Sequence, residues 1–125
     1  MAPAENYVGF DRNIYPGDAR LADLHKHFAF AGYWLNNPPE MTSNSWVGKR
    51  AAVRDAGFGF LVLFNGRLDA EIKKSNLKPE ELGRQDAEKA IAAAQHEGFL
   101  AGAVIFLDQE EGGRLLPEQI GRAHV

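Results

Sequence analysis

The sequence predicts an α/β fold made of parallel βα repeats. Four short apolar runs recur at residues 7–10, 28–35, 58–64 and 103–107, and stretches with helical spacing separate them. Nearly uninterrupted apolar runs are typical of strands covered on both faces, as in parallel sheets, and each strand–helix–strand unit implies a right-handed crossover. This rhythm is compatible with a doubly wound sheet and with half of an eight-stranded barrel, and it does not choose between them.

The first two strands flank a short amphipathic helix. The run at residues 7–10 is closed by Asp11, and Asp18 is placed to cap a helix with its side-chain oxygen. The apolar positions of that helix recur at spacings of three and four, at Leu21, Leu24 and Phe28. The second run, residues 28–35, leads into Asn36-Asn37-Pro38-Pro39, where two prolines prevent a helix from continuing.

The third strand follows a second helix, expected over residues 45–56. Gly57 suits the left-handed position after a helix end, and the strand at residues 58–64 follows it. A long charged loop is expected from Asn65 to Gly83, within which Pro79 suits a first helical turn.

The fourth strand follows a third helix, which Gly98 ends. The apolar stripe of this helix consists of Ala87, Ala90, Ile91 and Ala94. Because the connections from helix to strand are tight while those after the strands are long and polar, we expect the functional site at the carboxyl ends of the strands.

Composition narrows the classes of function. The chain has 125 residues, 45% hydrophobic and 25% charged, which fits one globular domain. Its formal charge of −3 offers no basic footprint for nucleic acid, and the absence of cysteine excludes disulfides and thiolate metal sites. Residues 1–6 lack the apolar core of a signal peptide, and no run is long enough to span a membrane. The sequence is compatible with a full-length protein that carries an upstream signal for export to the cell envelope.

Carboxylates at strand ends are the candidate catalytic groups. Asp108 and Glu110 lie two residues apart at the end of a strand, so both side chains point to the same face. Asp11 ends the first strand and faces the same end of the sheet. Crowded carboxylates in a poorly hydrated pocket raise one pKa and keep a proton for a leaving oxygen near neutral pH. The alternative is structural, because acids at strand ends often cap the next helix.

Aromatic residues near the second strand are candidates for stacking on sugar rings. Trp34 is the best of them, with a core position as the alternative, whereas Tyr33 and Trp46 are expected in the core because large aromatic side chains dominate burial in small domains.

Polar residues at the ends of the second and third strands are candidate substrate ligands. The amides of Asn36 and Asn65 can donate and accept hydrogen bonds with hydroxyl or acetamido groups, although such residues equally form turns. Arg67 near the same rim can bind a carboxylate, with a solvated surface arginine as the alternative.

No cofactor is indicated. His25, His27 and His96 lack the spacing of a zinc site, and the glycines of the chain match neither the dinucleotide fingerprint nor the phosphate-binding loop.

Several blocks in order resemble a known family. Gly9-Phe10-Asp11-Arg12-Asn13, Gly32-Tyr33-Trp34-Leu35-Asn36, Gly57-Phe58-Gly59-Phe60 and Phe106-Leu107-Asp108-Gln109-Glu110 are similar to blocks of the bacterial glycoside-hydrolase-like TIM-barrel family, which is related to Chalaropsis-type lysozymes. The resemblance spans residues 8–119 and implies the N-terminal half, about four strands, of a (β/α)8 barrel.

The resemblance also implies an activity and a set of site residues. It implies cleavage of peptidoglycan or a related amino-sugar glycan, with Glu110 as general acid, Asp108 orienting the substrate or stabilising charge, and Asp11 positioning. The alternative is a barrel that binds glycan without cleaving it.

The last six residues are expected to be foreign to the natural protein. Residues 120–125 match the translation of a sequencing adapter, so we expect a domain of residues 1–119 that continues in the natural protein. The alternative is a genuine short polar C-terminus. A complete barrel of this type has about 250 residues and eight strands. We therefore expect this piece to be inactive by itself.

Overall fold

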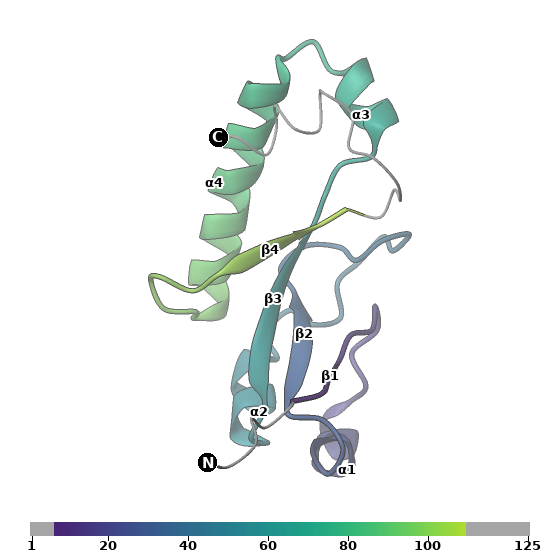
Figure 1. Cartoon of the computed structure of the whole chain (residues 1–125), viewed down its shortest axis with the longest axis vertical. Coiled ribbons are helices and arrows are strands. Elements are labelled where there is room, and N and C mark those ends of the chain that lie inside the picture. The colour runs from purple at the N-terminus through teal and green to yellow at the C-terminus, as the bar shows by residue number, and fades with distance from the viewer. Residues whose placement is uncertain (1–6, 110–125) are drawn as a thin grey trace, which may run out of the picture.

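A computed structural model of the chain describes residues 7–109 and shows a four-stranded parallel sheet with helices (Figure 1). The strands are β1 (Gly9–Phe10), β2 (Phe30–Trp34), β3 (Gly59–Asn65) and β4 (Ile105–Asp108). The helices are the 3-10 helix η1 (Asp18–Arg20) and the α-helices α1 (Leu21–His25), α2 (Arg50–Asp55), α3 (Asp69–Lys74) and α4 (Pro79–Glu97). The α/β class and the parallel repeats are confirmed.

The strands are arranged in sequence order, β1-β2-β3-β4, and every neighbouring pair is parallel. The central pair is the longest, running from Phe30 opposite Gly59 to Trp34 opposite Leu63. A doubly wound sheet reverses its strand order at a switch point, as in 3-2-1-4-5-6. These four strands contain no such reversal.

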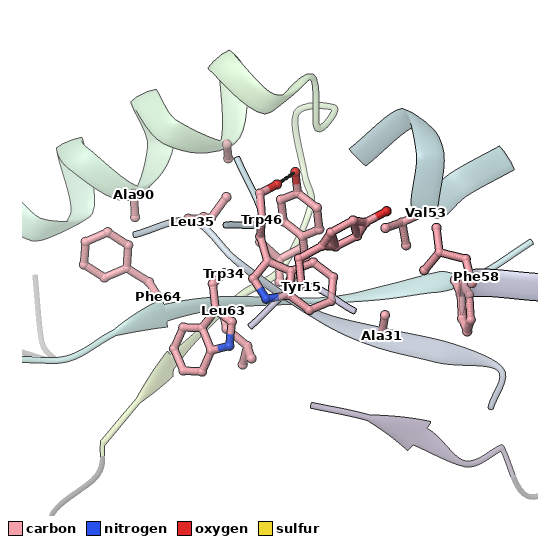
Figure 2. Close-up of a cluster of buried hydrophobic side chains, with 14 residues drawn as sticks. Tyr15, Ala31, Trp34, Leu35, Trp46, Val53, Phe58, Leu63, Phe64 and Ala90 are labelled. Atoms are coloured by element: carbon pink, nitrogen blue, oxygen red, sulfur yellow. Dashed lines mark hydrogen bonds between the residues drawn. The ribbon is translucent and has the colours of Figure 1, made fainter. Parts of the chain in front are cut away.

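The main core lies between the sheet and the helices on one of its faces. Alternate residues of β2 and β3 point to this face, and Figure 2 shows Ala90 of α4 and Val53 of α2 on the same side of the sheet as Leu35 and Phe64. Tyr33 is at its centre, fully buried, with ring centroids 5.7 Å from both Trp46 and Phe60 and 5.4 Å from Phe99. The expectation that Tyr33 and Trp46 are core residues is confirmed.

A buried polar contact ties this core to the end of α4. The Tyr33 hydroxyl lies 2.6 Å from Glu97 Oε2 and 2.7 Å from the carbonyl of Trp46, and it accepts a hydrogen bond from the Lys49 amide at 3.1 Å. Burial, and after it the Glu97 carboxylate, raises the pKa of Tyr33. Glu97 also accepts from the amide of Gly48 at 3.0 Å. The contact therefore joins three parts of the chain: β2, α4 and the segment that precedes α2.

Two helix boundaries differ from the prediction. The helix expected over 45–56 begins only at Arg50, because Gly48 has a φ of 79° and the preceding segment turns to bury Trp46. Trp46 donates its indole N–H to the carbonyl of Arg12 at 3.1 Å. Tertiary burial of one ring thus replaces the first turn of the expected helix.

The loop expected from Asn65 to Gly83 is largely helical. It contains α3, whose Ile72 is buried, and α4 already begins at Pro79, as a proline at the first helical position allows. The left-handed residues predicted after helices are confirmed at Gly57, with φ 100°, and Gly98, with φ 91°.

The first helical segment was predicted wrongly in two details. The side chain of Asp18 makes no capping hydrogen bond and instead accepts one from the Tyr15 hydroxyl at 2.5 Å. Because the hydroxyl supplies this hydrogen bond, the pKa of Asp18 falls. Furthermore, α1 ends at His25, so Phe28 lies outside the helix and packs beside Phe10, with ring centroids 5.4 Å apart.

Candidate functional site

The second face of the sheet carries the candidate carboxylates. Figure 2 shows Trp34 and Leu63 pointing to the side opposite Leu35 and Phe64, as strand alternation requires. Asp11, directly after β1, lies against this face at Gly32. A Cβ atom at Gly32 would lie 3.1 Å from Asp11 Oδ1 and 3.2 Å from Asp11 Cβ. Glycine at this position therefore lets the Asp11 side chain approach the backbone of β2 closely.

Asp108 comes to the same region from the far edge of the sheet. It is the last residue of β4 and is paired with Asn65 of β3, and its carbonyl accepts a hydrogen bond from the Gly66 amide at 2.7 Å. Burial of the Asp11 carboxyl is the largest cause that raises its pKa, and the negative charge of Asp108 is the second. Asp11 is nevertheless an exposed residue overall, so one side of this carboxylate remains open to solvent.

Two buried polar atoms near Asp11 lack a hydrogen-bond partner in the described part of the chain. They are the indole nitrogen of Trp34 and Oδ2 of Asp108. Trp34 itself is only 2% exposed. Buried polar atoms are nearly always paired, and an exception is often found at a functional site. One oxygen of the Asp108 carboxylate and the indole N–H of Trp34 thus lack a hydrogen-bond partner next to Asp11.

The two asparagines at the strand ends bond to the backbone. The side-chain amide of Asn36 donates to the backbone carbonyl of Asn65 at 3.1 Å and accepts from the backbone N–H of Asn65 at 2.7 Å. The side-chain amide of Asn65 donates to the backbone carbonyl of Asn37 at 3.0 Å. These contacts extend the β2–β3 pairing past the end of β2. As placed, both amides act as structural links rather than as free substrate ligands.

Arg67 is held in an ion pair. Its guanidinium donates to both carboxylate oxygens of Asp86 on α4, at 2.9 and 3.0 Å, and this bond is the main reason that the pKa of Arg67 is raised. The pair borders a pocket of about 370 Å³. This pocket lies between α4 and the carboxyl ends of β2 and β3, and its lining includes Leu35, Asn36 and Lys89.

Asp86 is the residue of this region that sequence reasoning missed. It is buried and lies on the core face of α4, four residues from Leu82 and four from Ala90, both of which are buried. Because a carboxylate is almost never buried without a partner, an acid spaced four residues from both Leu82 and Ala90 was the available signal. The predicted apolar stripe was wrong at Ala87 and Ile91, which are exposed.

The remaining predicted site residues divide into two groups. Glu110 lies outside the described residues, as do residues 120–125. Trp34 is described but is buried, so its ring offers no exposed face on which a sugar could stack in this structure. Asp11 and Asp108 are the two candidates that the fold brings together.

Within residues 7–109, His, Asp and Glu side chains form no cluster of three suited to hold a metal ion. No helix in the same range has the length and apolar character needed to cross a membrane.

Comparison with known proteins adds no relative. No family model matches the chain, and neither the curated proteins nor the solved structures include a significant match. The functional conclusion therefore depends on the geometry at Asp11 and Asp108.

Proposed function

We propose that this chain is part of a glycoside-hydrolase-like domain that cleaves peptidoglycan or a related amino-sugar glycan. The observation that carries the proposal is the convergence of Asp11, after the first strand, and Asp108, at the end of the fourth, on one face of a parallel sheet. Most glycosidases use a pair of carboxyl groups that flank the scissile bond.

The chemistry divides between a proton donor and a group that stabilises positive charge. In the proposal, Glu110 gives its proton to the glycosidic oxygen as the bond to the anomeric carbon breaks. Water then adds to that carbon and gives one proton back to the Glu110 carboxylate, which restores the acid. Asp108 orients the substrate or stabilises the oxocarbenium-like charge. Asp11, whose pKa is raised by burial and by Asp108, positions and tunes the pair.

The strand order supports the finer proposal of a (β/α)8 half-barrel. Sequential parallel strands are the order of a singly wound barrel, whose active site lies at the carboxyl ends of the strands, where Asp11 and Asp108 are found. The edge strand β4 also carries solvent-exposed apolar residues, such as Phe106, which is 50% exposed on the second face of the sheet. Further strands would cover such residues.

The competing proposal is a barrel that binds glycan without cleaving it. Such a module needs exposed aromatic faces, whereas Tyr33, Trp34 and Trp46 are all buried. The unpaired carboxylate oxygen of Asp108, close to the carboxylate of Asp11, favours a reacting site over a stacking platform.

The test uses the protein made from its complete reading frame and purified peptidoglycan. We expect release of reducing ends, and we expect Glu110→Gln and Asp11→Asn to reduce it at least 100-fold, which is the scale of a lost acid–base group. Asp23→Asn, at an exposed acid on α1, is the matched control and should leave the rate unchanged. Binding of peptidoglycan without any release of reducing ends would replace this proposal with the binding module.

A further inference from the structure

The indole N–H of Trp34 differs from that of the other tryptophan in the chain. Trp46 donates its N–H to the carbonyl of Arg12 at 3.1 Å, whereas the buried N–H of Trp34 has no hydrogen-bond partner among residues 7–109. A buried tryptophan usually finds an acceptor for this group. The position of Trp34 therefore calls for an acceptor that is close at hand.

Asp11 is the acceptor that the fold supplies. Trp34 and Gly32 lie two residues apart on the same face of β2, and Asp11 packs directly on Gly32. The indole N–H is close enough to lower the pKa of Asp11, against the opposite effects of burial and of Asp108. No hydrogen bond of ordinary length and angle joins the two side chains, and Asp11 is an exposed residue.

We infer that Trp34 is a positioning residue, whose buried indole N–H holds the ionised carboxylate of Asp11 on β2, in the seat left open by Gly32. A hydrogen bond to a charged acceptor is stronger than one to a neutral acceptor. When Asp11 takes up a proton, the attraction weakens and the carboxyl group is released from β2. The charge of Asp11 thus sets its place in the site. The inference rests on the proposed function only in treating Asp11 as a site residue.

The test follows the two indole N–H signals by nuclear magnetic resonance during a pH titration of the whole chain. The Trp34 signal should shift along the titration curve of Asp11, and in Asp11→Asn this shift should disappear. The Trp46 signal, already bonded to a carbonyl, is the internal control. Asp108 is the other charged group that acts on Asp11. A shift that persists in Asp11→Asn and disappears in Asp108→Asn would overturn the inference.

A second variant tests the same contact from the other side. In Trp34→Phe a smaller aromatic ring replaces the indole and the donor is lost, so the pKa of Asp11, read from its carboxyl carbon, should rise. An unchanged pKa in a folded variant would contradict the inference. If this variant does not fold, the titration of Asp11→Asn still decides. None of these readouts requires glycan cleavage, so an inactive protein whose Trp34 signal follows Asp11 would refute the proposed function alone.

Discussion

Replacement of Tyr33 by phenylalanine is the most direct test of how the core is tied to α4. The change removes one hydroxyl from a fully buried side chain, and with it the contacts to Glu97 at 2.6 Å and to the Trp46 carbonyl at 2.7 Å. A hydrogen bond to a charged group contributes about 1.5–3 kcal/mol to stability.

The partners of the lost hydroxyl keep other hydrogen bonds, which limits the effect. Glu97 still accepts from the Gly48 amide, and the Trp46 carbonyl still accepts from the Lys49 amide at 3.0 Å. No new unpaired group is therefore created, and we expect a loss of about 2 kcal/mol in the free energy of unfolding. For a chain of 125 residues this corresponds to a fall in Tm of roughly 8 °C.

Chemical denaturation followed by tryptophan fluorescence measures this loss. The matched control is Tyr15→Phe, whose hydroxyl donates to Asp18. Because this carboxylate is exposed and water competes for the bond, the hydroxyl should contribute less than about 1 kcal/mol. Equal losses in the two variants, or a loss below about 0.5 kcal/mol in Tyr33→Phe, would refute the reasoning.

Three further outcomes follow from the structure. Asp11→Asn should raise the free energy of unfolding at pH 7 and not at pH 3. Folding raises the pKa of the Asp11 carboxyl above 3.8, so the native protein loses stability as the pH rises through that raised pKa, and asparagine removes this loss. Chemical denaturation at both pH values checks this. A double-mutant cycle on Arg67 and Asp86, whose side chains are 26% and 10% exposed, should give a coupling of about 1–3 kcal/mol, and a value near zero would show that the pair is dispensable. Gly98→Ala should cost more than Gly102→Ala, which carries only the strain of about 1–2 kcal/mol for a left-handed backbone. A Cβ at Gly98 also meets the Arg50 guanidinium at 2.9 Å, and moving that group breaks its hydrogen bond to the Glu97 carbonyl; equal melting temperatures would contradict this.

The elements that were predicted well are those with a strong local signal. The apolar run around Val62 has no other plausible state than a buried strand, and the glycines at 57 and 98 adopt the left-handed conformation that ends a helix. The short helix α3 was missed because its single buried apolar residue, Ile72, gives no periodic pattern. A local pattern predicts a helix or strand only when several of its apolar residues recur at a regular spacing.

The candidate site was predictable in part. Asp11 and Asp108 were identified because parallel strands bring their carboxyl ends to one edge, and the structure places the two carboxylates within electrostatic reach. The roles of Trp34 and Arg67 were not predictable. Exposure of a ring and the partner of a guanidinium depend on side chains from distant segments, here Asp86 for Arg67.

The sequence by itself determined the α/β class, the parallel strands and the positions of Asp11 and Asp108 at strand ends, because alternation, apolar runs and turn residues act over a few neighbouring positions. Only the tertiary structure decided the strand order and the burial of Trp34 beside Asp11. The physical reason is that burial and charge coupling depend on distances through space, which chain neighbours do not set.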